Sequence, residues 1–339
     1  MNDICTILAD SAAQTQKAGS SLSKTLYGHS VTVALTGPLG AGKTTFLQGF
    51  ASSLGVREPL TSPTYALEQR YETPRGPFSH LDLYRLTDGQ ASELLHRSED
   101  ADGIRCIEWT ERVSMPRLLA SGPVIHVDVQ EGKGRDDRVI CIAFHDAAIP
   151  EETIIAQWRK DVLLPPHIAA HCDAVAGLCD RFAGVLMGQS HVIRTGALRA
   201  SGQVHDLFRF LDFRPGGHPD NDHGPEQLSV WEGIRKQYPG LHHEAACAQF
   251  LQERGFSALS SIVAVHGLSV PPPPDATIEQ KLLFYADKRV MLDRVVTLDE
   301  RFADFAERYG KGVVSDVAKE WFGITRKIEQ DLFADGPPF

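Results

Sequence analysis

No apolar segment of the chain approaches the roughly 20 consecutive residues that a membrane-spanning helix requires. The first residues, MNDICTILADSAAQ, also lack the basic and then apolar blocks of a secretory signal peptide. The six cysteines are scattered without CxxC spacing, which argues against a disulfide framework and against a zinc ribbon. These absences together predict a cytoplasmic protein with no membrane contact.

Acidic residues outnumber basic ones, 44 to 34. The net charge of -10 lacks the basic excess that a general nucleic-acid binder shows. Broad nucleic-acid binding is therefore not expected, although an action on RNA through a partner stays open. At 339 residues the chain is long for one hydrophobic core, so two domains are expected.

The residue pattern changes near the middle of the chain. The first half alternates short strand-like runs with helical ones, which is typical of an α/β domain. The strand-like runs lie at 31–37, 65–71, 78–86, 104–109, 123–129 and 138–144. From about 153 to 335, helical periodicity dominates instead. We therefore expect an α/β domain with a mixed, largely parallel sheet over 1–148, a linker over 149–160 and an all-α bundle over 161–335.

A phosphate-binding loop is the clearest motif of the first half. The stretch GPLGAGKTT at 37–45 fits G-x-x-x-x-G-K-[ST], after a strand-like run and before a helical one. In such a loop, backbone N–H groups and the helix N-terminus bind phosphate oxygens, the lysine reaches the β/γ-phosphates and the hydroxyl ligates Mg²⁺. ATP with Mg²⁺ is the expected cofactor. Its predicted contacts are Gly37, Leu39, Gly40, Ala41, Gly42, Lys43, Thr44 and Thr45.

Three further motifs follow the loop in order: TSPTYALEQRY at 61–71, HLDLYRL at 80–86 and IEW at 107–109. With the loop, they resemble the TsaE family, the small ATPases of bacterial tRNA threonylcarbamoyladenosine biosynthesis, over about residues 5–145. The resemblance implies that Asp82 is a Walker-B-like carboxylate and Glu108 a second acidic contact to the metal. It also implies a switch-like segment formed by Thr61, Ser62, Pro63 and Thr64, with Thr61 as a catalytic residue, and a place for Trp109 in the nucleotide region.

The residues themselves partly support these roles. Carboxylates at strand ends near the loop suit a Mg-nucleotide site. Two alternatives stay open, because Asp82 could cap a turn and Trp109 could pack in the core. Family members act with TsaB and TsaD, and ATP turnover resets that complex. The resemblance therefore implies TsaB- and TsaD-like partners and only indirect contact with tRNA.

The second half is rich in histidine, with nine of the fourteen between residues 160 and 270. At helical spacing, His171 shares an apolar face with Val175, Leu178 and Phe182, Asp287 shares one with Leu283, Phe284 and Met291, and His266 follows Leu259, Ile262 and Val263. His205 and Asp206 stand together in VHDLFRF. Buried carboxylates need a partner or a metal. Imidazoles and carboxylates that converge in a helical bundle suit Mn, Fe, Mg or Co better than a structural zinc.

The order H…HD…D, together with YADKRV around the last aspartate, resembles the HD-domain metal-dependent phosphohydrolases over roughly 160–310. The resemblance implies an HD-type helical bundle with one or two divalent metals. The implied ligands are His171, His205, Asp206 and Asp287, with Asp206 also catalytic, and His243 and His266 as the extra histidines of binuclear members. His167 is an alternative to His171, and His242 to His243. The chain departs from the pattern at Arg209, where many members have a lysine. Arginine can hold a phosphate but cannot act as an acid, so this residue is not expected to be a catalytic proton donor.

The leading hypothesis is a bifunctional fusion of a TsaE-like ATPase with an HD phosphohydrolase that acts on a nucleotide or related phosphoester. The alternative keeps the ATPase but makes the HD half a catalytically silent module that senses a nucleotide or a metal. A third hypothesis, a P-loop small-molecule kinase, lacks an obvious lid or acceptor-binding segment between the strands.

Overall fold

The computed structural model describes residues 3–28, 30–98, 102–213, 224–310 and 315–339. The chain divides into two compact units. The first, the α/β unit, contains the residues up to Ala147 together with Gly184–Thr195. The second, the helical unit, contains Ala148–Ala183 and Gly196–Phe339.

The α/β unit is built on a seven-stranded sheet in the order β1-β7-β6-β2-β5-β4-β3. Strands β6, β2, β5 and β4 run parallel, while β1, β7 and β3 pair antiparallel with their neighbours. The predicted mixed, largely parallel sheet is confirmed. The strands are β1 (Asp3–Ala9), β2 (Val31–Thr36), β3 (Glu68–Thr73), β4 (Gly76–Asp82), β5 (Ile104–Glu108), β6 (Val124–Glu131) and β7 (Arg138–Phe144).

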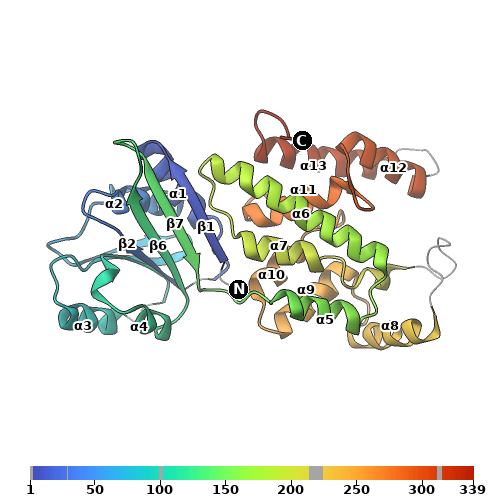
Figure 1. The fold of residues 1–339 in the computed structure, drawn as a ribbon, viewed down its shortest axis with the longest axis horizontal. Helices are drawn as coiled ribbons and strands as arrows, with labels where there is room; N and C mark the ends of the chain where they lie inside the picture. Colours follow the sequence, from blue (N-terminus) through green and yellow to red (C-terminus); the bar gives the residue numbers. More distant parts are fainter. Residues whose placement is uncertain (1–2, 29, 99–101, 214–223, 311–314) are drawn as a thin grey trace. The chain divides into compact units, whose positions relative to one another are not determined.

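Helices cover both faces of this sheet (Figure 1). On one face, α1 (Ala12–Ser23) and α2 (Lys43–Ser53) pack on a core that includes Val33 and Leu35 of β2. On the other, α3 (Asp88–Ser98) and α4 (Met115–Ala120) pack on a smaller core that includes Ala34. Because successive strand residues face opposite ways, a central strand with a helix layer on each side is buried at nearly every position, as β2 is.

Three strand predictions differ from the structure. The edge strand β1 was not expected, although its residues alternate strictly between buried and exposed. The strand predicted at 65–71 begins only at Glu68, because Leu67 adopts a φ of 67° in a turn closed by its N–H to the carbonyl oxygen of Pro63. The strand predicted at 78–86 ends at Asp82, whose Oδ1 accepts the N–H of Tyr84 and so turns the chain.

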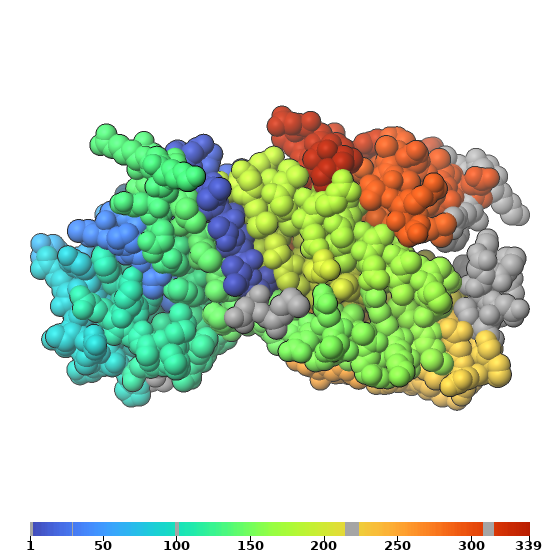
Figure 2. All heavy atoms as spheres, in the orientation of Figure 1, coloured from blue at the N-terminus to red at the C-terminus, as the bar shows by residue number. Residues whose placement is uncertain are grey.

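The helical unit begins in the predicted linker, where residues 152–161 form α5 and bury Ile155 and Trp158. Figure 2 shows that the side chains of α5 and of the long α6 fill one continuous surface of this unit. The unit is mainly helical. Its helices are α5 (Glu152–Asp161), α6 (Pro166–Gly188, whose last turn belongs to the α/β unit), α7 (Thr195–Val204), α8 (Pro225–Gln237), α9 (His243–Glu253), α10 (Ser257–Val263), α11 (Ile278–Lys288), α12 (Leu298–Gly310) and α13 (Asp316–Leu332).

The prediction of a purely α-helical second half needs one correction. Strands β8 (Val290–Met291) and β9 (Arg294–Val295) form a short antiparallel hairpin directly after α11. Leu292 in its turn has a φ of 59°, so the helix cannot continue through it. A capping box between Thr277 and Gln280 fixes the start of α11.

Residues 184–195 complete the core of the α/β unit. Val192 is fully buried in the core beneath α1 and α2, and its backbone N–H donates to the Ser21 hydroxyl at 2.8 Å. Arg194 forms paired 2.7 Å bonds with both carboxylate oxygens of Asp146. No helix among the described residues is both long and apolar enough to cross a membrane.

Candidate functional site

The phosphate-binding loop lies between β2 and α2, which is the context that its motif requires. Gly37 and Gly42 have φ angles of 129° and 102°, which side chains disfavour. A Cβ on Gly37 would also lie 2.1 Å from the carbonyl oxygen of Val129. The loop therefore needs glycine at both positions, and it ends where Lys43 begins α2. The N-terminus of this helix favours a bound anion.

Lys43 is held over the loop by three groups. Its Nζ donates to the carbonyl oxygens of Gly37 at 2.7 Å and Pro38 at 2.9 Å, and lies 3.7 Å from the centre of the Trp109 ring. Burial lowers the pKa of the Lys43 ammonium, although nearby carboxylates, first Glu108, oppose the change. Phosphate oxygens would offer this ammonium charged acceptors in place of neutral carbonyls.

Two carboxylates end neighbouring strands beside the loop. Asp82 of β4 and Glu108 of β5 are paired residues in the parallel register. Glu108 accepts the Thr44 hydroxyl at 2.9 Å, while Asp82 accepts the hydroxyls of Ser62 and, at 2.8 Å, Thr64. Oxygen ligands grouped in this way suit Mg²⁺.

These groups surround a cavity of about 420 Å³. Nine of the twelve residues predicted for the nucleotide site line this cavity. The other three do not line the cavity: Gly37 and Ala41 are buried within the loop, and Thr61 is exposed. Three lining residues were not in the predicted contact set: Tyr84, whose ring lies 4.7 Å from that of Trp109, and Ser62 and Thr64 from the switch-like segment. The cavity is lined by Leu39, Gly40, Gly42, Lys43, Thr44, Thr45, Ser62, Thr64, Asp82, Tyr84, Glu108 and Trp109.

The helical unit brings its predicted metal-binding residues together. His171 lies on α6, His205 and Asp206 directly follow α7, His243 begins α9 and Asp287 lies on α11. The sixth, His266, lies three residues beyond the end of α10, so the expected helical position is corrected. Ligand atoms of two triplets lie within 4.8 Å of one another: His171, His205 and Asp287, and His205, Asp206 and His266.

Three of these imidazoles share one orientation. Nδ1 of His171, His205 and His266 lies 2.8, 2.8 and 2.6 Å from the carbonyl oxygens of Leu292, Gly202 and Val263. A carbonyl oxygen can only accept, so each Nδ1 carries a proton, and Nε2 is the nitrogen that can bind a metal once it is unprotonated. Metal-binding histidines are oriented in this way.

The available nitrogens face carboxylates. Nε2 of His171 lies 3.0 Å from Oδ1 of Asp287, and Nε2 of His266 lies 3.7 Å from Oδ1 of Asp206. Nε2 of His205 is buried without a hydrogen-bond partner among the described residues, 3.8 Å from Asp206 and 3.7 Å from Asp287. A buried orphan nitrogen beside two carboxylates fits a bound cation.

The electrostatics agree with this fit. Burial would raise the pKa of Asp206, but the charge on His205 and the hydrogen bonds that His243 and His266 donate hold it well below its usual value. A metal bound between these rings and Asp206 would take the place of those protons. Burial likewise opposes the lowered pKa of Asp287, which Lys288 and the two neighbouring histidines cause. Both carboxylates are therefore ionised, as metal ligands must be. Imidazole and carboxylate donors together suit a divalent transition metal or Mg²⁺.

The geometry distinguishes the two pairs of alternative histidines. His167 is exposed, whereas His171 contacts Asp287. The His242 side chain is 81% exposed, whereas that of His243 is 3% exposed and lies 3.0 Å from Asp206.

Sequence reasoning missed three groups around this cluster. Lys288 donates to Asp287 at 2.5 Å and to the carbonyl oxygen of His266 at 2.6 Å. Its position directly after a buried aspartate was the available signal. Asp212 and Glu244 contact His243, and nothing in the local sequence indicates this.

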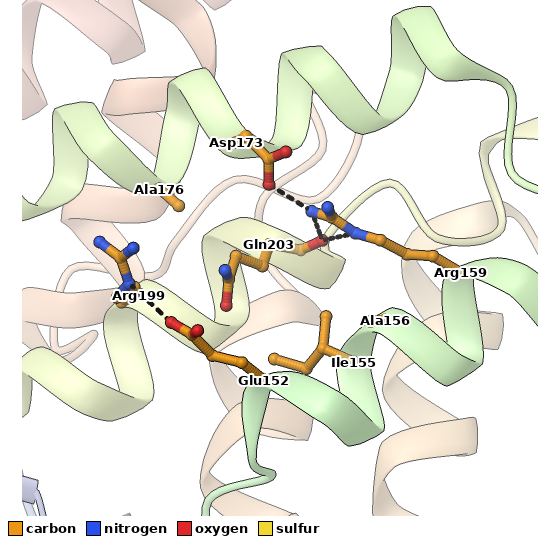
Figure 3. A pocket seen from close by; sticks show the side chains of 8 residues that line it. All are labelled: Glu152, Ile155, Ala156, Arg159, Asp173, Ala176, Arg199 and Gln203. Carbon is orange, nitrogen blue, oxygen red and sulfur yellow. Dashed lines mark hydrogen bonds and ion pairs between the residues drawn. The ribbon is translucent and has the colours of Figure 1, made fainter.

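A second cavity, of about 390 Å³, lies among α5, α6 and α7 (Figure 3). Its charges are paired with one another. Arg159 bonds Asp173 at 2.8 Å and the carbonyl oxygen of Gln203, and Arg199 lies 3.9 Å from Glu152. None of the predicted site residues lines it.

Comparison with known proteins assigns the α/β unit. The family model of the threonylcarbamoyl adenosine biosynthesis protein TsaE matches residues 9–140. The TsaE of Aquifex aeolicus is 39% identical over 108 residues, which are 31% of this chain and 77% of that protein. Through its N-terminal part, the chain belongs to the TsaE family. The Nostoc TsaE is 42% identical over 111 residues, 31% of this chain and 67% of that protein.

Among solved structures, Bacillus subtilus YdiB aligns at 26% identity over 43% of this chain and 88% of its own, with a TM-score of 0.31. The TsaE match contains every residue that lines the 420 Å³ cavity. Membership of the TsaE family therefore implies an ATPase-type activity for this unit.

Proposed function

We propose that the chain is a bifunctional fusion, whose α/β unit is an ATP-hydrolysing subunit for tRNA threonylcarbamoyladenosine biosynthesis. The related proteins carry that function in their names. TsaB- and TsaD-like subunits are the proposed partners, and contact with tRNA is left to them. The net charge of -10 fits a subunit that does not itself bind RNA.

The proposed roles follow from the cavity. The loop amides and Lys43 bind the phosphates, and Thr44, Asp82 and Glu108 hold Mg²⁺, which neutralises charge on the transferred phosphoryl group. Ser62 and Thr64 tie the switch-like segment to Asp82.

Lys43→Ala tests this half. Removing the ammonium should abolish ATP binding in calorimetric titration, and Asp82→Ala should spare binding more than hydrolysis. Wild-type ATP turnover in Lys43→Ala would refute the assignment.

For the helical unit we propose a metal-dependent phosphohydrolase of the HD type, acting on a nucleotide or related phosphoester. The observation that carries this proposal is the shared orientation of His171, His205 and His266, with Nε2 aimed at Asp206 and Asp287. One or two divalent ions such as Mn, Fe, Mg or Co would be held there. A bound divalent ion supplies hydroxide at neutral pH by lowering the pKa of its water.

Arg209 favours a second candidate. Its side chain is 38% exposed, and its Nη1 lies 3.3 Å from Nδ1 of His243. The guanidinium can hold a phosphate group but has no proton to give at neutral pH. A module that binds a phosphoester and metal without turnover is therefore the alternative, in which the unit senses a ligand.

Measuring phosphate release from nucleotides, phosphomonoesters and dinucleotides would distinguish the phosphohydrolase from the sensing module. The background should be the full chain with Lys43→Ala, so that the P-loop contributes no phosphate. We expect metal-dependent release that Asp206→Ala abolishes and His242→Ala retains. Metal binding without release from any substrate would favour the sensor, and full activity in Asp206→Ala would exclude the cluster as the active site.

A further inference from the structure

Arg138, the first residue of β7, contacts the phosphate-binding loop but does not line the 420 Å³ cavity. Its Nε donates to the carbonyl oxygen of Ala41 at 2.7 Å, and its Nη2 donates to that of Gly40 at 3.4 Å. Its Nη1 donates to the carbonyl oxygens of Asp137 at 2.7 Å and Arg135 at 3.1 Å. The guanidinium therefore joins the loop to the connection between β6 and β7, although 97 positions separate Arg138 from Ala41.

These bonds determine which way one peptide group of the loop faces. In a planar trans peptide the C=O and the N–H point in opposite directions. Because the carbonyl oxygen of Ala41 is bonded to Arg138, the N–H of Gly42 points away from the guanidinium. Gly42 lines the cavity, and a Cβ on it would lie 3.8 Å from Nε of Arg138. Arg138 is therefore placed to direct the N–H of Gly42 toward bound phosphate oxygens.

Lys43 holds the first residues of the loop from within the cavity. Its Nζ donates to the carbonyl oxygens of Gly37 and Pro38. In the function proposed for this unit the same ammonium binds phosphate, so these two bonds break when a nucleotide enters. The bonds from Arg138 do not involve the cavity and can persist. Of the two cations, Arg138 is the one that can hold the loop in the same conformation with and without nucleotide.

We propose that Arg138 is a positioning residue of the nucleotide site, which acts through the loop backbone and does not contact the nucleotide. The inference rests on the nucleotide binding proposed for the α/β unit, and it adds a residue that lies outside the four sequence motifs of that unit. A loop whose donors already face the ligand loses less conformational freedom on binding. Loss of Arg138 should cost about 10–100-fold in nucleotide affinity, the size of one hydrogen bond to a charged group.

The test is the affinity of the full chain for ADP, measured by calorimetric titration with Mg²⁺ and again in EDTA. In EDTA the loop and Lys43 bind the phosphates without help from a metal. We expect Arg138→Met to weaken ADP binding by about 10–100-fold in both conditions. In the nucleotide-free protein, hydrogen exchange read by mass spectrometry should become faster in a peptide covering residues 38–46 and stay unchanged in a peptide from β5.

Three further variants separate hydrogen bonding from charge and from folding. Arg138→Lys keeps the charge but loses the guanidinium fork, and Arg138→Gln keeps an N–H donor without the charge. If hydrogen bonds position the loop, both variants should bind ADP with affinities between those of wild type and Arg138→Met. Arg135→Met removes an exposed arginine three residues earlier and should bind ADP like the wild type.

The outcomes distinguish the inference from the proposed function. No ADP binding by the wild type, with or without Mg²⁺, overturns the nucleotide site itself. Wild-type affinity and wild-type loop exchange in a folded Arg138→Met overturn the role of Arg138 alone. Full affinity in Arg138→Lys, with Arg138→Gln as weak as Arg138→Met, means that the charge acts at a distance and overturns positioning through hydrogen bonds. If Arg138→Met does not fold, the comparison of Arg138→Gln with wild type decides.

Discussion

Arg194→Ala should destabilise the α/β unit far more than a surface substitution would. The side chain belongs to residues 184–195, which follow the helical segment that carries His171. Its guanidinium bonds both oxygens of Asp146 at 2.7 Å, its Nε donates to the carbonyl oxygen of Thr25 at 2.9 Å, and it lies 4.2 Å from the ring centre of Phe144. The side chains of Arg194 and Asp146 are 1% and 6% exposed.

The expected size follows from this burial. Removing one partner of a buried ion pair leaves an uncompensated charge and costs about 3–5 kcal/mol. A domain is stabilised by only about 5–15 kcal/mol in total, so Arg194→Ala should bring the α/β unit near its unfolding limit. Replacing both partners, as Arg194→Met with Asp146→Leu, should recover much of the loss because no charge is left buried.

Hydrogen exchange in increasing urea, read by mass spectrometry on peptides from α1 and β7, reports this unit alone. The matched control in the same unit is Arg97→Ala, which removes an arginine of α3 that is 72% exposed and paired with Glu93. Loss of that pair should cost less than about 1 kcal/mol. Equal shifts for the two alanine variants would refute the reasoning. The same contacts predict that a fragment ending at residue 195 is more stable than the fragment 1–148.

Three smaller predictions concern single side chains. Burial lowers the pKa of His191 to about 4 from 6.5, so the unfolded chain binds more protons and stability should fall as pH drops from about 6.5 to 4; His191→Gln should flatten that loss in acid unfolding curves. His171→Ala should reduce bound Mn²⁺ in elemental analysis, and His167→Ala should not, because His171 contacts Asp287 whereas His167 is exposed. Ser62→Ala should slow ATP turnover more than Thr61→Ala, and equal rates would contradict the contact with Asp82.

The sheet could be predicted where local pattern and tertiary environment agree. Central strands are buried on both faces because helices cover both sides, and β2 and β5 are buried at nearly every position, although β5 includes Arg105 and Glu108. The strand ends could not be predicted, since they depend on single residues. Leu67 takes a left-handed backbone, and Asp82 accepts the N–H of Tyr84, and neither event leaves a periodic signal.

The phosphate-binding loop could be predicted from the sequence because its motif is a run of consecutive residues, 37–45. The cavity adds Tyr84, which sequence reasoning had placed on a strand; it reaches Trp109 only because the chain turns after β4. Similarly, the packing of Val192 beneath α1 joins residues that are far apart in the chain. A boundary drawn from a change in periodicity cannot detect a short segment that packs back on the other unit.

In the histidine cluster too, the sequence could not predict which side chains and which ring atoms face one another. His242 and His243 are adjacent and identical in type, yet one is 81% exposed and the other 3%. The start of α9 determines which of them turns inward, because His243 is its first residue and His242 its cap. Which ring nitrogen would bind a metal depends further on the atom that lies opposite Nδ1. For His205 that atom is a carbonyl oxygen three residues earlier, and for His243 it is the carboxylate of Asp212, 31 residues away. Residue type and spacing can therefore propose a ligand, but only the fold determines its donor atom and the charge behind it.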